Sequence, residues 1–413
     1  MKIAVIGSGI SGLSAAYFLS KRHKVDLFEK NDHFGGHSYT VDAEYEKDKK
    51  IFVDVGFIVF NHLNYPNLIN FFRENKIDID KSNMSFSVSV KDTSIEYCGK
   101  GLSGIFANRN NLFNIKFLKM FFDILNFYKK SSNLKNLDVN ETLGNYLKKQ
   151  NLSKFFIDYH LIPMVSAIWS IPPNESSTMP LKFFLNFFQN HGLFKLKDRP
   201  QWYTVKNRSR TYVNKILSQI SGEYYKNYKI NKVKRESNRI KIYYGDRSEF
   251  FDYEKIVLAT HADDALSIID NPLKEEKEIL SNFHYKKNHA VLHTDEKAMP
   301  KNKKIWSSWN SKIDNKDTKN NSVTYWLNLL QNLNINKNIF LTLNPFFKID
   351  EKKIIKKVDF THPYYDQKTL VNQKKLNLIQ NKKNILFCGS YFGYGFHEDG
   401  IKSSLEMVKH IND

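Results

Sequence analysis

The hydrophobic pattern at the start of the chain predicts a strand, a helix and a second strand in immediate succession. Residues 2–7, KIAVIG, form a short apolar run of the kind that makes a buried strand. Apolar side chains then recur at helical spacing over residues 11–20, and residues 24–30, KVDLFEK, have the pattern of another strand. Because almost no residues separate these elements, the sequence predicts one tight βαβ unit.

Shorter strand and helix patterns continue along the rest of the chain. Runs typical of strands occur at residues 52–60, 86–90, 228–233, 239–244, 255–260, 290–294, 323–329, 340–343 and 384–389. Helical spacing occurs at residues 65–74, 114–129 and 400–410, and residues 181–189 are very rich in phenylalanine. The sequence shows no internal repeat and no long linker.

A glycine motif occupies the turn between the first strand and the first helix. Gly7-Ser8-Gly9-Ile10-Ser11-Gly12 matches G-x-G-x-x-G, and Glu29 closes the second strand. Gly7 allows the tight turn, Gly9 lets the backbone approach a pyrophosphate, and Gly12 lets helix and strand pack closely. The helix N-terminus offers N–H groups to phosphates, and Glu29 can accept hydrogen bonds from ribose hydroxyls. This context predicts a dinucleotide site; the alternative is a tight βαβ turn without a ligand.

The positions of the nucleotide-type elements also predict the domain organisation. They lie at both ends of the chain and in its middle, so one discontinuous domain is expected over residues 1–75, 205–265 and 380–413. A second domain, residues 76–204 and 266–379, would be inserted into it twice. The predicted fold class is α/β, with a Rossmann-like dinucleotide-binding domain and an inserted α+β substrate domain.

Composition narrows the classes of protein that fit. The chain has 413 residues, of which 41% are hydrophobic and 26% charged, and no apolar run is long enough to span a bilayer. Its two cysteines, Cys98 and Cys388, exclude a disulfide framework or a cysteine-based zinc module, and we expect no metal. The net charge of +20 comes from basic residues spread along the chain, so we expect no nucleic acid as partner. Since a strand starts at Lys2, we expect no signal peptide and a cytoplasmic protein.

A second glycine pair follows Glu29 in Asp32-His33-Phe34-Gly35-Gly36-His37-Ser38. Here the chain resembles the flavin-containing amine oxidase and phytoene desaturase superfamily, and within it the bacterial NAD/FAD-binding, amine-oxidase-like proteins. The resemblance spans nearly the whole chain and is carried by VDVGFIVFN (53–61), MSFSVS (84–89), HGLFKLKDRPQW (191–202), VLATHADDAL (257–266), AVLHTD (290–295), WSSWN (306–310), VTYWLN (323–328) and FCGSYFGYGFHEDG (387–400). It implies the two-domain fold of that superfamily, with a Rossmann-like FAD-binding domain that holds FAD without a covalent bond.

Matching the superfamily motifs residue by residue implies a set of FAD-binding residues. They are Gly7, Ser8, Gly9, Ile10, Ser11, Gly12, Glu29, Lys30, Gly35, Gly36, His37, Ser38, Gly56, Phe57, Ile58, Val59, Ile230, Ala259, Thr260, Gly389, Ser390, Asp399, Gly400 and Ile401. The chain departs from the motifs at two of these positions: His37 stands where the superfamily usually has arginine, and Ser390 replaces an acidic residue. The resemblance further implies that the last helix starts at Gly400, with its N-terminus toward the flavin.

The segment before Gly400 holds the candidate catalytic residue. Amine oxidases carry a tyrosine of their aromatic cage at the position of His397, so the resemblance implies an incomplete cage here. We expect His397 to act as a base that titrates near neutral pH, with an ordinary pKa of about 6.5. The alternative is structural, with Glu398 or Asp399 capping the last helix. The tryptophans Trp169, Trp306 and Trp309 either line the pocket or belong to the core.

Together these features predict an FAD-dependent oxidoreductase that removes hydride from a C–H bond of a hydrophobic small molecule or lipid. The apolar middle of the chain and the incomplete cage favour a desaturase acting on a fatty-acyl or other lipid chain. Two alternatives stay open: oxidation of an amine, and a non-catalytic flavoprotein that binds a lipid or a partner. Residues 114–129 mix apolar side chains with lysines, which is typical of a helix at the inner face of a membrane or of an ordinary core helix.

Overall fold

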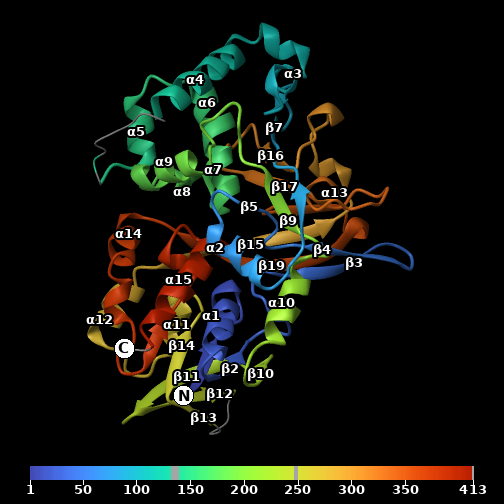
Figure 1. Ribbon diagram of the computed structural model, residues 1–413. Coiled ribbons are helices and arrows are strands. Elements are labelled where there is room, and N and C mark those ends of the chain that lie inside the picture. Colours follow the sequence, from blue (N-terminus) through green and yellow to red (C-terminus); the bar gives the residue numbers. More distant parts are fainter. Residues whose placement is uncertain (132–137, 139, 246–249, 412–413) are drawn as a thin grey trace.

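The computed structural model describes residues 1–131, 138, 140–245 and 250–411. One lobe is built on a parallel sheet in the order β10 (Tyr224–Tyr225), β2 (Lys24–Phe28), β1 (Lys2–Ile6), β14 (Lys255–Leu258) and β20 (Ile385–Phe387). All of its strand pairs are parallel, and β1 and β2 are joined by α1 (Ile10–Ser20), as the sequence predicts. Both termini lie in this lobe (Figure 1).

Alternation along the strands gives this sheet a core on each face. Ile3 and Val5 pack with α1, α2 (Pro66–Glu74), α10 (Ser209–Leu217) and α15 (His397–Lys409). Ala4 and Ile6 pack on the opposite face with the small sheet β11 (Ile230–Glu236), β12 (Arg239–Tyr244) and β13 (Phe250–Tyr253). The helices α11 (Ala262–Ile268) and α12 (Lys274–Leu280) cover the same face. The sheet is therefore buried on both faces, which is why its strands read as continuous apolar runs.

The other lobe combines a mixed sheet with a layer of helices (Figure 1). The sheet order is β19 (Ile354–Tyr364), β15 (His284–His293), β18 (Phe340–Leu343), β17 (Asn321–Trp326), β16 (Trp309–Ile313), β7 (Phe86–Val90) and β8 (Glu96–Cys98). The helical layer comprises α3 (Gly101–Ile105), η1 (Arg109–Phe113), α4 (Ile115–Ser131), α5 (Leu143–Lys149), α6 (Lys154–Phe156), η2 (Ile157–Leu161), α7 (Ile162–Trp169), α8 (Pro173–Ser176) and α9 (Leu181–Asn190). Together the lobes confirm the predicted fold class, a discontinuous Rossmann-like domain with an inserted α+β domain.

Short elements complete the chain. They are β3 (Thr40–Glu46), β4 (Lys49–Asp54), β5 (Phe60–Asn61), β6 (Ile79–Ser82), β9 (Trp202–Val205), α13 (Leu327–Leu330), α14 (Gln367–Gln373), and the 3₁₀ turns η3 (Glu296–Ala298), η4 (Lys303–Ile305), η5 (Glu351–Lys353), η6 (Leu376–Ile379) and η7 (Ser390–Phe392). None of the helices among the described residues combines the length and the apolar character that crossing a membrane requires.

Three elements differ from the sequence-based expectation. Residues 52–60 do not form one strand: β4 ends at Asp54 and β5 begins at Phe60. Asp54, the last residue of β4, has a buried carboxylate that accepts hydrogen bonds from the Ser209 backbone N–H, 2.9 Å away, and from the Ser209 hydroxyl, 2.7 Å away. The last helix begins at His397 rather than at Gly400. Residues 327–330, expected as the end of a strand, form α13.

Packing also differs from the expected domain boundaries in two places. Leu280 and Phe283, together with Leu376 and Ile379, join the core of the Rossmann-like lobe, although the expected boundaries assign residues 266–379 to the other domain. Conversely, the β3–β4 hairpin packs its apolar side chains against the mixed sheet of the other lobe. Both segments connect the two lobes, and a cavity lies between the lobes.

Candidate functional site

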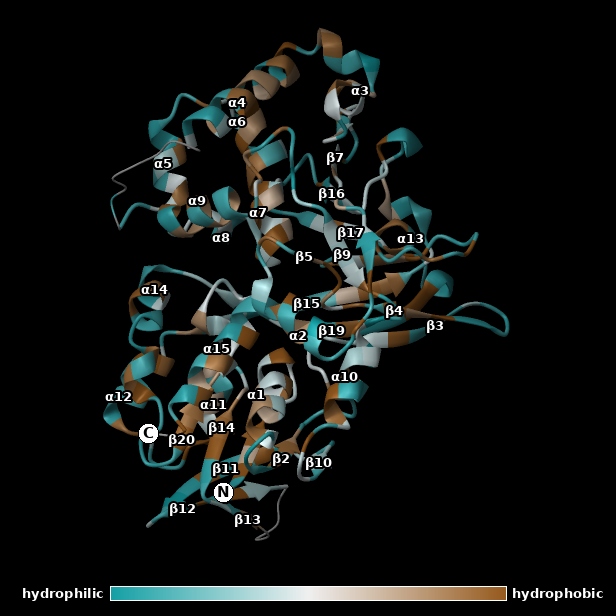
Figure 2. Cartoon of the chain, in the orientation of Figure 1, coloured by the Kyte–Doolittle hydropathy of each residue, from teal (hydrophilic) through white to brown (hydrophobic). Residues whose placement is uncertain are grey.

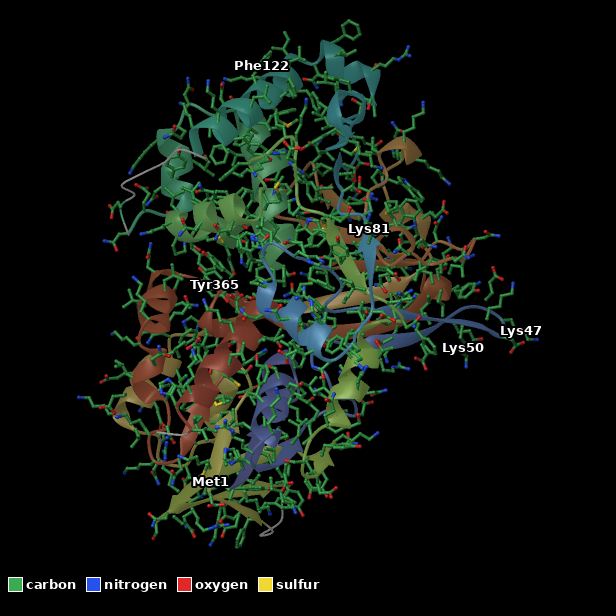
Figure 3. All side chains as sticks on the ribbon, viewed as in Figure 1. Met1, Lys47, Lys50, Lys81, Phe122 and Tyr365 are labelled. Carbon is green, nitrogen blue, oxygen red and sulfur yellow. The ribbon has the colours of Figure 1, made fainter. Side chains whose placement is uncertain are left out.

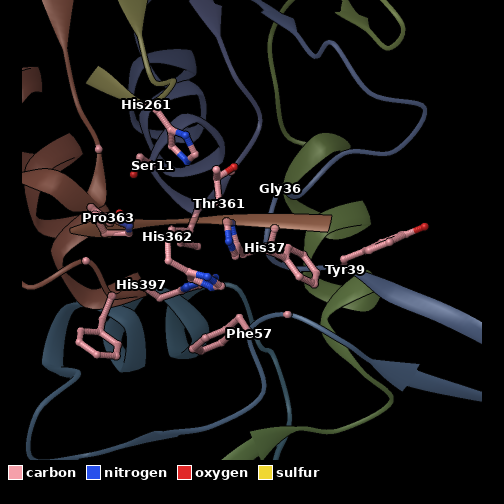
Figure 4. A pocket seen from close by; sticks show the side chains of 18 of the residues that line it. Ser11, Gly36, His37, Tyr39, Phe57, His261, Thr361, His362, Pro363 and His397 are labelled. Carbon is pink, nitrogen blue, oxygen red and sulfur yellow. The ribbon is translucent and has the colours of Figure 1, made fainter. Parts of the chain in front are cut away.

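A cavity of about 720 Å³ runs between the lobes, over the carboxyl ends of the parallel strands. Its floor is the βα turn after β1, the end of β2 and the residues that follow β14 and β20. Ligands of open α/β sheets bind at this edge because the loops that leave the strands diverge there. Figure 4 shows that side chains from β19 in the other lobe reach the same cavity.

The glycine loop at the floor leaves room for a ligand where the motif requires it. A Cβ atom on Gly9 would have no heavy atom within 4 Å, so this backbone faces open space. A Cβ atom on Gly12 would lie 1.8 Å from the Gly7 carbonyl oxygen, so only glycine allows α1 to approach the loop. No side chain caps the N-terminus of α1, whose first N–H groups and positive dipole end therefore face the cavity unneutralised. This is a cradle for an anionic group such as a pyrophosphate.

Glu29 lies at the end of β2, where the sequence predicts a ribose-binding acid. Its Oε2 accepts hydrogen bonds from the Ser8 backbone N–H at 3.0 Å and from the Ser8 hydroxyl at 2.5 Å. Its Oε1 accepts from the backbone N–H and the side-chain amide of Asn31, at 2.9 and 2.8 Å. The buried carboxylate thus holds the glycine loop in shape, and it still lines the cavity.

The second glycine pair packs directly on the first loop. The Gly35 backbone N–H donates to the Ser8 carbonyl at 3.1 Å, and a Cβ atom on Gly36 would lie 3.0 Å from the Gly9 Cα atom. Gly36 has a φ of +58°, in the left-handed region that favours glycine. The chain can therefore pass close to the pyrophosphate cradle at this point and carry His37 into the cavity.

Among the described residues, six histidines line the cavity, and four of them, His37, His261, His362 and His397, lie in the same part of it (Figure 4). Burial lowers the pKa of all four: that of His37 well below its ordinary value, that of His362 to about 4 and that of His397 to about 3. Each is therefore neutral at physiological pH. His37 does not supply the positive charge of the arginine that it replaces, and its Nε2 atom is buried without a hydrogen-bond partner. That atom is left unsatisfied by the protein's own polar groups.

His397 forms part of the wall. Its ring stacks on Phe57, with centroids 3.6 Å apart, and its Nε2 lies 3.0 Å from the Ser38 hydroxyl, which also contacts the Tyr212 hydroxyl. A pKa of about 3 contradicts the expected titration near neutral pH, because desolvation disfavours the charged imidazolium. A neutral histidine that is stacked and hydrogen-bonded positions its neighbours, and it is a weak proton acceptor.

The two acids after His397 cap helices. Asp399 accepts a hydrogen bond from the Phe396 backbone N–H at 2.9 Å, at the start of α15, and burial raises its pKa to about 6. Glu398 accepts from the backbone N–H groups of Asn67 and Leu68, at 3.1 and 3.0 Å, at the start of α2. Asp399 therefore caps the last helix, as the structural alternative from the sequence expects, whereas Glu398 caps α2 instead.

The part of the cavity beyond the histidines is enclosed by apolar and aromatic side chains. They come from α7, α9, α13, the mixed sheet and the loops beside them: Met84, Ala167, Ile168, Trp169, Phe187, Leu193, Trp202, Trp309, Tyr325, Leu330, Leu341, Leu343, Tyr394 and Phe396. The charged residues that line the cavity are Glu29, Lys30, Lys229, Asp264 and Asp359. Lys30 pairs with Asp264 at 3.1 Å, and Asp359 pairs with Lys287 at 2.9 Å. No charge faces the apolar end of the cavity among the residues that the structure describes.

Of the tryptophans considered from the sequence, Trp169 and Trp309 belong to this wall, whereas Trp306 packs in a separate cluster with Phe340 and Met299. The indole N–H of Trp306 donates to the Pro300 carbonyl at 2.8 Å. The indole nitrogens of Trp169 and Trp309 are buried and have no hydrogen-bond partner. Neither nitrogen has accessible surface in the cavity, so a hydrogen-bond acceptor of a ligand would reach these unsatisfied donors only after a shift of the ring.

The structure brings most of the sequence-predicted residues to the cavity. Lining it are Gly7, Ser8, Gly9, Ile10, Ser11, Glu29, Lys30, Gly36, His37, Gly56, Phe57, Ile58, Val59, Ile230, Ala259, Thr260, Gly389, Ser390 and His397. Gly12, Gly35, Ser38, Asp399, Gly400 and Ile401 lie behind this lining. Gly400 instead packs on α1, where a Cβ atom would lie 2.7 Å from the Ser11 hydroxyl oxygen.

Sequence reasoning did not propose four of the histidines that line the cavity, namely His33, His191, His261 and His362. His261 directly follows the Ala259-Thr260 pair, and this adjacency could have suggested it. His362 lies on β19, which reaches the cavity only because β19 pairs with β15 along the whole strand. No local pattern at residues 354–364 signals this contact.

Comparison with known proteins agrees with this geometry. Residues 5–74 match a family described as an NAD(P)-binding Rossmann-like domain. The match covers the glycine loop of the Rossmann-like domain, Glu29 and the second glycine pair. No protein of curated function matches the chain in sequence.

Solved structures share the fold of the whole chain beyond the Rossmann-like domain. A fatty acid isomerase from P. acnes that produces CLA superposes with a TM-score of 0.68 at 14% identity, over 98% of this chain and 97% of the isomerase. Cyclohexylamine oxidase from Brevibacterium oxydans IH-35A gives 0.67 at 14%, over 100% and 99%. Putrescine oxidase bound to putrescine gives 0.70 at 10%, over 100% of both chains. At these identities the likeness shows that the chain shares the fold of these structures.

Proposed function

We propose that the protein is an FAD-dependent oxidoreductase that removes hydride from a C–H bond of a fatty-acyl or other lipid chain. The cofactor side of the cavity supports the proposal first. The open face at Gly9, the uncapped start of α1 and the buried Glu29 fit the pyrophosphate and the adjacent ribose of a dinucleotide. The unpartnered Nε2 atom of His37 adds a polar group that the protein itself leaves unsatisfied.

The same cavity extends past the histidines, so one ligand can meet the cofactor side while another occupies the apolar end. FAD bound on the floor would supply the hydride acceptor for oxidation of a C–H bond. The chain would hold its pyrophosphate with the loop Gly7–Gly12 and the N-terminus of α1, and would enclose its other end with the Phe57–His397 wall. The aromatic and aliphatic residues beyond would exclude water and hold the substrate.

The uncharged lining at the apolar end is the observation on which the proposed class of substrate rests. An ammonium group there would lose its hydration without a carboxylate to pair with it, which is costly in a low-dielectric site. An alkyl chain would gain from the same surroundings, since burying each CH₂ group is worth about 0.8 kcal/mol. This observation favours an acyl chain over an amine, although two structures of the same fold are amine oxidases by name.

The unpartnered indole N–H groups of Trp169 and Trp309 narrow the proposed class of substrate. Each would form a hydrogen bond to a neutral acceptor, such as an ester or amide carbonyl, at one point along an otherwise apolar chain. A free carboxylate is less suited to this wall, because no cation compensates its charge. We therefore propose an esterified acyl chain as the substrate class.

Anaerobic reduction of the bound flavin tests the proposal. The flavoprotein would be mixed with phospholipids carrying monounsaturated or saturated acyl chains, with cyclohexylamine and with putrescine, while the visible flavin absorption is followed. We expect bleaching with an acyl lipid, a product lighter by two hydrogen atoms and no bleaching with either amine. Bleaching by an amine alone would identify an amine oxidase. Bleaching by none of them, with an acyl lipid still bound, would favour a non-catalytic flavoprotein.

A further inference from the structure

The outer end of the helical layer exposes a group of large apolar side chains. It comprises Leu102 of α3, Leu112 and Phe113 of η1, and Ile115 and Phe122 of α4, which we call the tip patch. Phe113 is 86% exposed and Ile115 is 82% exposed, the two highest values for large apolar side chains in the described chain. In Figure 3, Phe122 lies at the end of the molecule farthest from the N-terminus. Scattered exposed apolar residues are normal, but a contiguous group marks an interaction site.

The tip patch is separate from the face that α4 packs into the protein. Phe117, Met120, Ile124 and Phe127 lie on the inner face and are buried in the core of the helical layer. Ile115, Lys119 and Phe122 follow one another at intervals of four and three residues, so they share the outer face. The helix is therefore apolar on both faces, and its inner face already accounts for the folding of this lobe. Figure 2 shows hydrophobic residues among hydrophilic ones along the outer end of the layer.

Along the chain segment that forms the tip patch, residues 100–131, the exposed charges are of one sign. Between residues 100 and 131 the basic residues are Lys100, Arg109, Lys116, Lys119, Lys129 and Lys130. The acid in this stretch is Asp123, which is only 7% exposed and accepts a hydrogen bond from the Ser153 backbone N–H at 2.8 Å. Apolar side chains that project between cations are complementary to a surface with an apolar interior and an anionic boundary.

We propose that the tip patch docks the protein onto an anionic lipid membrane. Phe113, Ile115 and Phe122 would enter the boundary between headgroups and acyl chains, while Lys116 and Lys119 would lie among the anionic headgroups. The uniform positive charge selects an anionic bilayer over a second copy of this chain, because two such patches repel each other. This docking needs neither the cofactor nor the redox reaction, so its test is independent of the proposed function.

Co-sedimentation of the purified full chain with lipid vesicles tests the docking. We expect binding to vesicles that contain phosphatidylglycerol, weak binding to vesicles of phosphatidylcholine alone, and loss of most binding at high salt, where surface charges are screened. The combined variant Phe113→Ser, Ile115→Ser and Phe122→Ser should lower the partition coefficient at least about tenfold, because the apolar area leaves the boundary. The pair Lys116→Glu and Lys119→Glu should lower it at least about 25-fold, at roughly fivefold for each lysine.

Matched variants elsewhere on the surface serve as controls. Leu378 is 61% exposed in the other lobe, so Leu378→Ser removes a comparable apolar side chain. Lys47 and Lys50 lie at the exposed end of the β3–β4 hairpin, away from the tip patch (Figure 3), so Lys47→Glu with Lys50→Glu makes the same change of charge. Both controls should bind vesicles like the parent. All of the variants change exposed residues, and circular dichroism with flavin content verifies their fold.

Three results would overturn the proposal. The first is no binding of the parent to phosphatidylglycerol vesicles at low salt. The second is an equal loss of binding in the control variants, which would mean that net charge alone attracts the vesicles. The third is a dimer in lipid-free solution that the triple serine variant abolishes, since the tip patch would then be an interface between copies of the chain.

Discussion

The neutral state of His397 leads to a prediction about stability at mildly acidic pH. Burial lowers its pKa to about 3, whereas the unfolded chain has the ordinary value of about 6.5. A histidine with a lowered pKa contributes stability that is complete above pH 6.5 and is lost as the pH falls, because the unfolded state binds the proton more readily. From about pH 7.5 to about pH 5.5, this one side chain should cost the folded state about 1.4 kcal/mol.

The variant His397→Phe isolates that contribution. Phenylalanine keeps an aromatic ring against Phe57 and removes the hydrogen bond to Ser38, which retains its contact with Tyr212. At about pH 7.5 the variant should be less stable than the parent by about 1 kcal/mol, the typical net value of one hydrogen bond. At about pH 5.5 the free energy of unfolding of the variant should equal or exceed that of the parent, because the variant has no imidazole that must stay unprotonated in the folded state.

Urea unfolding of both proteins at the two pH values measures the difference. Ser38→Ala is the control: it removes the same hydrogen bond but keeps the imidazole, so it should lose stability with pH as the parent does. If His397→Phe loses as much stability on acidification as the parent, the imidazole titrates near its ordinary pKa in the folded protein. The sequence-based expectation of a base near neutrality would then be right, and our interpretation of His397 as a neutral wall would be wrong.

Three further predictions concern other buried polar groups. Trp169→Phe removes an unpartnered indole N–H but keeps a ring beside Phe187; flavin content should not change, and KM for an esterified acyl substrate should rise about three- to tenfold in steady-state assays. An unchanged KM would show that the indole meets no acceptor. Glu398→Ala leaves the start of α2 without its cap and should lower the free energy of unfolding by about 1–2 kcal/mol, whereas exposed Glu406→Ala should change it little. Glu276→Ala leaves the buried Arg235 guanidinium without its carboxylate partner. The free energy of unfolding measured in urea should fall by about 3–5 kcal/mol, and a fall below about 1 kcal/mol would contradict the pairing.

The features that could be predicted from the sequence are those whose residues lie close together along the chain. The βαβ unit, the glycine loop and Glu29 lie within thirty residues, and their local pattern sufficed to place them at the cavity floor. The short strands in the second half of the chain could also be predicted, because each has its own local hydrophobic pattern. Their order in the mixed sheet was not, because β7 pairs with β16 across more than two hundred residues.

The protonation state of a side chain could not be predicted from residue type either. Histidine at position 397 suggested a group that titrates near neutral pH, but burial, with the ring stacked on Phe57, lowers its pKa to about 3. The helix start at His397, rather than at Gly400, was missed for a similar reason: Asp399 bonds back to the Phe396 N–H, and the motif drew attention to the glycine. Tertiary contacts decided both.

The flavin content of purified protein tests the central claim most directly. Gly9→Val places its side chain in open space, so the protein should fold normally, yet the branched side chain would fill the cradle at the start of α1. Gly99→Val, at a surface glycine whose Cβ atom would meet nothing closer than 3.9 Å, is the matched control. We predict that heat releases about one FAD per chain from the parent and from Gly99→Val, and almost none from folded Gly9→Val. Full FAD occupancy in Gly9→Val, or a parent that neither carries FAD nor takes it up, would contradict the claim.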